Sequence, residues 1–177
     1  MNTDSRLEKI LASGALAVTS ECGPPRGALP EKVKEKAALL KDHVDGINVT
    51  DNQTAMVRMS SFAAGIIIKQ MGLDPIMQMV ARDRNRLAMQ SDIIGAYAFG
   101  INTMLCLSGD HAKFGDHPMA QGVFDIDSVQ MINMVRRMRD EKTFQGGAKI
   151  DGAPKMFIGA AANPFADPFE LRVMRLA

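Results

Sequence analysis

The sequence contains no tryptophan, one tyrosine and two cysteines among its 177 residues. So few aromatic rings argue against a surface that stacks the bases of a single-stranded nucleic acid. Cys22 and Cys106 lie far apart and form no C-x-x-C pair, so we expect neither a disulfide framework nor a zinc site built on the cysteines. Free thiols indicate a reducing compartment, and we expect the protein in the cytoplasm.

The sequence also lacks a large excess of positive or negative charge, and it lacks long apolar runs. The net charge is +1, which provides no basic surface for a nucleic acid or an acidic membrane. No run of 18 apolar residues is present, and the N-terminus has no basic region followed by a long apolar core. We therefore predict no transmembrane helix and no signal peptide, and we expect neither nucleic acid nor membrane as a partner.

What the sequence does have is a regular alternation of apolar runs and helical patterns. Strands are expected at residues 15–21, 45–52, 75–83, 101–110 and 155–164, and helices at 30–44, 57–72, 85–100, 127–141 and 167–177. Pro30 suits a helix start, Asp127 or Ser128 an N-cap, and Gly72 a C-terminal cap. Consecutive strand-helix units predict an α/β fold with a parallel sheet.

Two architectures fit this alternation. No G-x-G-x-x-G follows the first strand, which disfavours a dinucleotide-binding domain. A (β/α)8 TIM barrel is favoured, with about five of its eight strand-helix units present, since a whole barrel takes about 250 residues. We expect residues 1–177 to form a single domain of this kind, truncated at its C-terminal end. A flavodoxin-like open sheet is the alternative.

Polar residues gather where the expected strands end and are scarce inside them. In a barrel, the active site lies at the carboxyl ends of the strands. The residues expected on this rim are Glu21, Thr50, Asp51, Asn52, Arg82, Asp83, Gly109, Asp110 and Asn163. The pattern therefore predicts one site at that end of the sheet.

Six segments carry a resemblance to a known family. In chain order they read ECGPPRG, VDGINVTDNQT, RDRNR, LCLSGDH, FDIDSVQ and IGAAANPFADPFE. Together they resemble the methylenetetrahydrofolate reductase family, in the form found beside acetyl-CoA-pathway and corrinoid methyl-transfer enzymes. The resemblance covers the N-terminal part of the family's domain.

The resemblance implies a (β/α)8 barrel flavoprotein that binds FAD and reduces 5,10-methylenetetrahydrofolate to 5-methyltetrahydrofolate, a step of one-carbon metabolism and methionine biosynthesis. It also implies an electron-donating partner, such as a small zinc-containing subunit, and we expect a homo-oligomer. The alternatives are a non-catalytic truncated α/β subunit or fragment, and a pterin-dependent methyltransferase domain, which would bind no flavin.

The resemblance assigns catalytic roles to Glu21 and Asp110. Opening the methylene bridge requires a proton on the leaving nitrogen, and Glu21 matches the family's general acid. The residues next to Glu21 are neutral, which predicts a buried carboxyl. The alternative is a structural role for Glu21 in an ion pair with Arg26. Asp110 matches the aspartate near both flavin and pterin, where a carboxylate stabilises developing positive charge; the alternative is a simple loop.

Further positions match the family's flavin contacts. These are Thr50, Gln78, Leu107, Ser108, Gly109, Asp110, Phe124, Asn163 and Asp167. Gln78 stands where other members have a histidine, Ser108 where many have arginine, and Phe124 where others have a tyrosine. For Asp167, a capping role before Pro168 is the alternative.

Two other groups of residues have no assigned role. Arg82, Arg84 and Arg86 in RDRNR are interpreted first as a solvated charge run and second as ionic groups near the site. Cys106, His111 and His117 fit no standard zinc spacing, so we predict no metal site.

Overall fold

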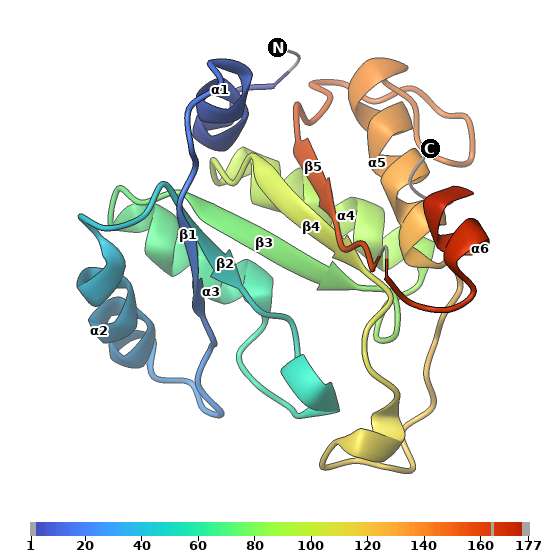
Figure 1. Cartoon of the computed structure of the whole chain (residues 1–177), viewed down its shortest axis with the longest axis horizontal. Helices are drawn as coiled ribbons and strands as arrows, with labels where there is room; N and C mark the ends of the chain where they lie inside the picture. The colour runs from blue at the N-terminus through green and yellow to red at the C-terminus, as the bar shows by residue number, and fades with distance from the viewer. Residues whose placement is uncertain (1–2, 164, 175–177) are drawn as a thin grey trace.

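The computed structural model describes residues 3–163 and 165–174 and contains one parallel sheet flanked by helices (Figure 1). The strands are β1 (Thr19–Cys22), β2 (Gly46–Val49), β3 (Pro75–Val80), β4 (Thr103–Leu107) and β5 (Phe157–Ala160). The α-helices are α1 (Arg6–Ala12), α2 (Pro30–Leu40), α3 (Ser61–Gln70), α4 (Arg86–Ala98), α5 (Ser128–Asp140) and α6 (Phe169–Met174). Two 3-10 turns, η1 (Gln53–Ala55) and η2 (Ala112–Phe114), lie in the loops after β2 and β4.

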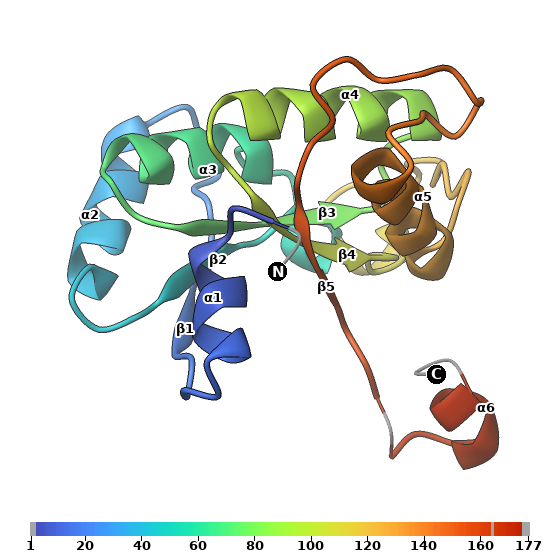
Figure 2. The ribbon, with the colours of Figure 1, turned by 90° about the horizontal axis from the view of Figure 1, so that it is seen from above.

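The order of the strands excludes one of the two expected architectures. Strands that are consecutive in the chain are also neighbours in the sheet, in the order β1-β2-β3-β4-β5, and every pair is parallel. A flavodoxin-like sheet has the order 2-1-3-4-5, so that alternative is wrong. In Figure 2, α2 to α5 lie on one side of the sheet, as the outer helices of a barrel do. Within the described residues the sheet stays open between β1 and β5.

The core lies between the sheet and the helices on that side. The larger cluster, under α4 and α5, includes Met77, Met79, Met89, Ile93, Met104, Cys106, Met131, Met134, Val135 and Met138. The smaller one, under α2 and α3, contains Cys22, Val33, Ala37, Ile47, Val49, Ala64 and Ile68. The many methionines therefore fill the core, as their flexible side chains allow. Both cysteines are free and buried, and burial raises the pKa of Cys106 to about 12.

Helix α1 was not expected from the sequence. It begins after Ser5, whose hydroxyl accepts the Glu8 N–H at 3.2 Å and lies 2.7 Å from the Thr103 hydroxyl at the start of β4. Arg6 pairs with Asp45, just before β2, at 3.3 Å. The helix has seven residues and buries none of them fully. Leu7, Ile10 and Leu11 do have helical spacing after the cap Ser5, but this pattern spans less than two turns and the sequence interpretation missed it. Polar contacts hold it at the amino ends of the strands.

The boundaries of the other elements follow their caps. Asp127 is the N-cap of α5 and forms a capping box with Gln130, Pro30 opens α2, and Gly72 follows α3 with φ +77°. Helix α3 begins later than expected because the Ser60 hydroxyl caps it through Ala63 N–H. Strands β2, β3 and β4 end three residues earlier than expected because the polar residues that follow them leave the sheet as loops. Strand β1 begins four residues later than expected, at Thr19, and β5 covers only Phe157–Ala160. The expected strand residue 164 and helix residues 175–177 lie outside the described residues.

The packing of α4 predicts a large effect of truncating Ile93, which is fully buried between this helix and the sheet. Ile93→Ala should lower the free energy of unfolding by about 2–5 kcal/mol, from lost burial and the cavity left behind. Equilibrium urea unfolding measures this. Leu87→Ala is the matched control, because Leu87 lies on the same helix with 75% of its surface exposed and should change stability by about 0.5 kcal/mol or less. Equal effects of both changes would contradict the packing described.

Candidate active site

The carboxyl ends of β1 to β4 enclose a cavity of about 330 Å³, which we name the strand-end cleft. It is lined by Glu21, Thr50, Asp51, Asn52, Gln53, Gln78, Val80, Arg82, Leu107, Ser108, Gly109 and Asp110. The cleft therefore brings together both expected catalytic carboxylates and most of the expected flavin contacts. Of the predicted rim residues, Asp83 and Asn163 do not line it.

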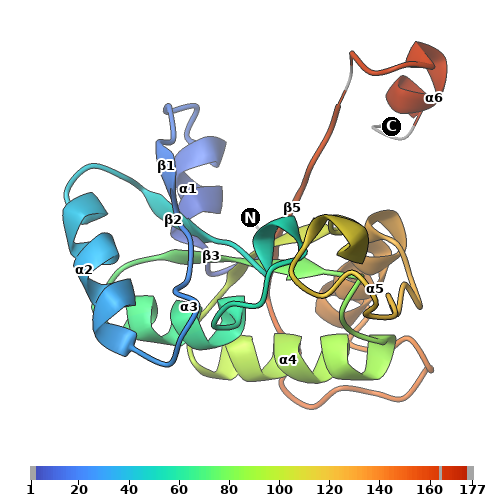
Figure 3. The same cartoon turned by 90° about the horizontal axis from the view of Figure 1, so that it is seen from below.

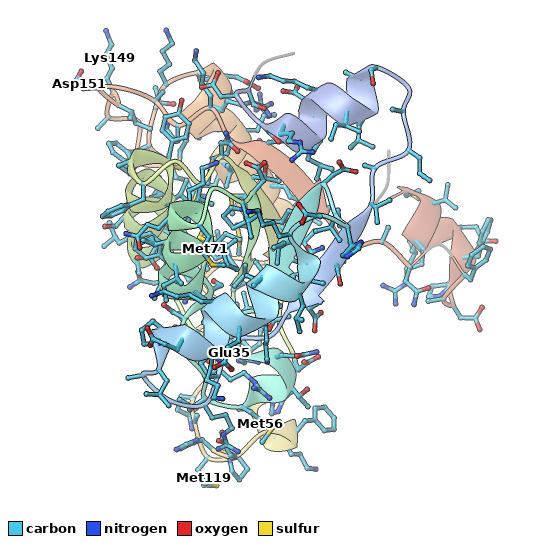
Figure 4. All side chains as sticks on the ribbon, turned by 90° about the vertical axis from the view of Figure 1, so that its left-hand side faces the viewer. Glu35, Met56, Met71, Met119, Lys149 and Asp151 are labelled. Carbon is cyan, nitrogen blue, oxygen red and sulfur yellow. The ribbon has the colours of Figure 1, made fainter. Side chains whose placement is uncertain are left out.

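The loops that shape this cleft lie at the end of the molecule opposite α1. Figures 1 and 3 show η1 and η2 together below the sheet. In Figure 4, Met56 and Met119, from the same two loops, lie at this end, whereas Lys149 and Asp151 lie at the other. The loops contact each other closely: a Cβ on Gly115 would meet the Ala55 carbonyl oxygen at 1.8 Å. The loops after β2 and β4 therefore pack against each other next to the cleft.

Glu21 lies on edge strand β1, beside Asn48 of β2 in the sheet register. Its side chain is exposed, whereas the next residue, Cys22, points into the core. The expected burial of Glu21 is therefore wrong, because strand alternation turns the carboxyl away from the helices. The alternative ion pair with Arg26 is wrong too, because Arg26 pairs with Asp116 in the loop after β4.

Thr50 and Gln78 line the middle of the cleft. Thr50 follows β2 and is 2% exposed, and its Oγ1 atom is buried with no hydrogen-bond partner among the described residues. A buried hydroxyl without a hydrogen-bond partner costs free energy, so a bound ligand that supplies the missing hydrogen bond would be favourable here. Gln78 is half-buried in β3, and its main-chain carbonyl accepts a hydrogen bond from Ser61 at 2.6 Å, which ties β3 to α3.

Gly109 and Asp110 form the cleft wall after β4. Gly109 has φ +90°, and a Cβ there would lie 3.0 Å from Val80 Cβ, so only glycine fits without strain. The close packing brings the main chain of this loop against β3. The Asp110 carboxylate accepts the Thr54 N–H at 3.1 Å, which links the loops after β2 and β4.

Arg82 and Asp83 form an ion pair at the cleft. The Arg82 side chain is buried, and the Asp83 side chain is partly exposed. The Arg82 side chain is 4% exposed, and its Nε lies 2.7 Å from Asp83 Oδ1. Burial alone would raise the pKa of Asp83, but hydrogen bonds from Arg82 and Asn52 and the nearby positive charges hold it below its usual value. The hydrogen bond to Asp83 raises the pKa of Arg82.

The same motif continues into two more ion pairs. Arg84 donates to both carboxylate oxygens of Asp51, at 2.6 and 3.2 Å, and to Asp92 of α4 at 3.1 Å. Arg86 pairs with Asp125, and hydrogen bonds from Arg86 lower the pKa of Asp125 to about 2. The first interpretation of RDRNR as a solvated run is therefore wrong for Arg82 and Arg84. Arg82 is held by the adjacent Asp83 and by the main-chain carbonyls of Asn52 and Asp110, and Arg84 is held by the carboxylates of Asp51 and Asp92.

Three expected flavin contacts lie away from the strand-end cleft. Phe124 is 45% exposed in the loop before α5. Asn163 lines a separate cavity after β5 together with Ser128 and Arg172. Asp167 is exposed two residues before α6, so it does not occupy the position directly before the helix. Their assignment to a cofactor stays a prediction.

Two lining residues were not predicted, Gln53 and Val80. Gln53 directly follows the predicted rim residue Asn52, so its position after β2 was the available signal. Val80 closes β3 and carries no polar group, so no sequence signal marked it. Among the described residues, no cluster of three or more histidine, cysteine or acidic side chains could hold a metal ion. No described helix is long and apolar enough to cross a membrane.

The fold and the cleft together define an α/β domain with barrel-type strand order and a cavity at the strand ends that is lined by carboxylates. A comparison with protein families gives the particular family: the methylenetetrahydrofolate reductase model matches residues 6–172, and the chain belongs to that family. This makes it an oxidoreductase-type domain of folate one-carbon metabolism. A search of curated proteins found none that matches the chain.

The packing of Gly109 predicts that Gly109→Ala will destabilise the chain by two additive effects. A side chain at this φ costs about 1–2 kcal/mol, and overpacking against Val80 and Arg82 adds about 1–3 kcal/mol. Gly72→Ala is the matched control, because Gly72 has φ +77° and a Cβ added there would meet nothing within 4 Å, so it bears the first cost alone. Urea unfolding of the two variants compares them, and an equal loss in both would mean that the loop does not pack on β3.

Proposed function

We propose that the protein reduces 5,10-methylenetetrahydrofolate to 5-methyltetrahydrofolate, with FAD as its cofactor. The observation that carries the proposal is the convergence of Glu21 and Asp110 with Thr50 and Gln78 in one cleft. Family membership supports a folate substrate and an oxidoreductase. The two carboxylates supply what the chemistry requires, a proton donor and a negative charge beside a forming cation.

Two observations support the binding of a flavin ring in the cleft. The buried, unpartnered Thr50 Oγ1 lacks a hydrogen-bond partner that a ligand would provide. The glycine at 109 presents main chain, with no side chain, to the cavity. Thr50, Gln78 and residues 107–110 would hold the ring, and bound FAD would supply the hydride. Phe124, Asn163 and Asp167 are proposed to contact its more distant parts.

Glu21 is proposed as the general acid. Its carboxyl lies on the rim of the cleft on strand β1, within reach of solvent, so it can be reprotonated after each turnover. In the cleft it would protonate the nitrogen that leaves when the five-membered ring of the folate opens. This opening produces an iminium cation on the substrate, which is the species that accepts hydride.

Asp110 is proposed to stabilise that cation. One of its carboxylate oxygens accepts the Thr54 N–H, so the group is held in one orientation before the substrate arrives. A charge fixed in advance stabilises developing positive charge without reorganisation during the reaction. The same negative charge should disfavour the addition of electrons to a flavin beside it.

The remaining parts of the proposal concern partners and location. We propose an electron-donating protein partner, such as a small zinc-containing subunit, and self-association supported by the edge strands β1 and β5. Sedimentation analysis of the purified chain would detect self-association. The two free, buried thiols support a cytoplasmic location. A pterin-dependent methyltransferase would bind no flavin, so the absorbance spectrum of the purified protein separates that alternative.

Replacing the proposed acid tests the mechanism directly. Glu21→Gln should retain the flavin and still accept electrons, but folate reduction should slow by about 10²- to 10⁴-fold because no proton reaches the leaving nitrogen. Steady-state turnover of methylenetetrahydrofolate measures this. Glu35→Gln is the matched control, since Glu35 is an exposed carboxyl on α2 (Figure 4) that pairs with Lys32 and should leave turnover unchanged. Normal turnover in Glu21→Gln would remove Glu21 from the mechanism.

Removing the charge of Asp110 should have two effects. Asp110→Asn should raise the reduction potential of the bound flavin, because a nearby negative charge opposes added electrons, and it should slow folate reduction. A potentiometric titration and the folate assay measure the two effects. Asp151→Asn serves as the control, because Asp151 is exposed at the opposite end of the molecule (Figure 4). An unchanged or lower potential in Asp110→Asn would place Asp110 away from the flavin.

A further inference from the structure

We propose that Arg82 is a positioning residue that fixes the orientation of the Asp110 carboxylate. The guanidinium holds the main chain on both sides of the hydrogen bond that orients this carboxylate. The inference rests on the proposed function in one respect, the action of Asp110 on the folate. Neither composition nor the family match assigns this role to Arg82.

The guanidinium of Arg82 connects three polypeptide segments. Its Nη1 donates to the Asp110 carbonyl at 2.8 Å and its Nη2 to the Asn52 carbonyl at 3.2 Å. Nε and Nη2 donate to the two carboxylate oxygens of Asp83 at 2.7 and 2.8 Å. The side chain is 4% exposed, so these bonds are protected from water and their geometry is well defined.

The two carbonyls that Arg82 holds belong to the two partners of the orienting bond. Asp110 accepts the Thr54 N–H through its carboxylate, and Arg82 holds the carbonyl of the same residue. Asn52, held by Arg82 at its carbonyl, lies two residues before Thr54 in the loop after β2. Arg82 therefore sets the separation between the acceptor and its donor.

The loops after β2 and β4 have backbone conformations that must be stabilised by contacts from other segments. Asn52, Thr54 and Ala55 have φ of 44°, 57° and 55°, which costs energy for residues other than glycine and persists only when neighbours enforce it. Asp110 follows Gly109, which adopts φ +90°, a conformation that is likewise kept by its packing against Val80 and Arg82. The main chain of Arg82 adds to the hold, since its N–H donates to the Ser108 carbonyl at 3.1 Å.

Arginine is suited to this position because its planar fork donates in several fixed directions at once, whereas lysine is a point charge on a flexible stem. Arg139 on α5 provides the matched comparison. Its Nε and Nη2 donate to the two carboxylate oxygens of the adjacent Asp140 at 2.6 and 3.0 Å, and its Nη1 donates to the Met156 carbonyl at 3.3 Å. Arg139→Lys therefore disturbs the same kind of ion pair and main-chain contact without touching the loops after β2 and β4.

The first test reads the orienting bond itself and requires no cofactor. Solvent exchange of the Thr54 amide proton, measured by NMR, should be about tenfold faster in Arg82→Lys than in the parent protein, because the bond to Asp110 is weakened. Exchange at Thr54 should stay at the parent rate in Arg139→Lys. An unchanged rate in Arg82→Lys overturns the proposal. If Arg82→Lys does not fold, Arg82→Gln replaces it with the same expectation, since its amide keeps one donor.

The second test asks whether Arg82 acts through Asp110. Arg82→Lys should lower kcat/KM for methylenetetrahydrofolate about tenfold in the parent protein, mainly through kcat, and less than twofold in the Asp110→Asn background. A tenfold loss in both backgrounds overturns the proposal, because Arg82 would then act independently. If Asp110→Asn alone reduces folate normally, the proposed role of Asp110 fails, and the Thr54 exchange rate still decides whether Arg82 positions the carboxylate.

Discussion

Parallel pairing of consecutive strands is the constraint on which the site depends. Each strand is joined to the next by a segment that contains a helix, and these helices lie on the same side of the sheet. The loop at the carboxyl end of each strand therefore lies beside the loops of the adjacent strands. The register sets Glu21 beside Asn48 and Gln78 beside Leu105. Residues far apart in the chain, such as Glu21 and Asp110, therefore line one cleft.

Charge pairs, more than apolar packing, hold the loops of this cleft. Asp51 is fully buried and receives hydrogen bonds from Arg84 and from the Val80 N–H, and Arg82 connects Asp83 with two main-chain carbonyls. Buried ion pairs add little net stability, since desolvation offsets their attraction, but breaking one partner is strongly unfavourable. Such a network is suited to specify one loop arrangement, which is what a site needs.

An apolar run that changes abruptly to polar residues marks where a buried strand meets solvent, and this signal located each strand-to-loop junction, although β2, β3 and β4 end three residues before the predicted bounds. That signal located Thr50 and Asp110 in one cleft. It did not mark α1, whose own signal, the spacing of Leu7, Ile10 and Leu11 after the cap Ser5, is short and was missed. Nor could it reveal the burial of Arg82, because the groups that draw it inward come from three loops that meet only in the folded chain.

The two carboxylates of the cleft differ in a way that supports the two roles proposed for them. Asp110 is held at its carboxylate by Thr54 and at its carbonyl by Arg82, so its charge has a fixed direction. A fixed charge suits stabilisation of a cation, whose position is set by the bound substrate. Glu21 lies exposed on an edge strand, where a carboxyl can exchange protons with solvent between turnovers. If the roles were exchanged, the fixed Asp110 would have to be reprotonated in every turnover. The exposed Glu21, whose charge is screened by solvent, would have to stabilise the cation.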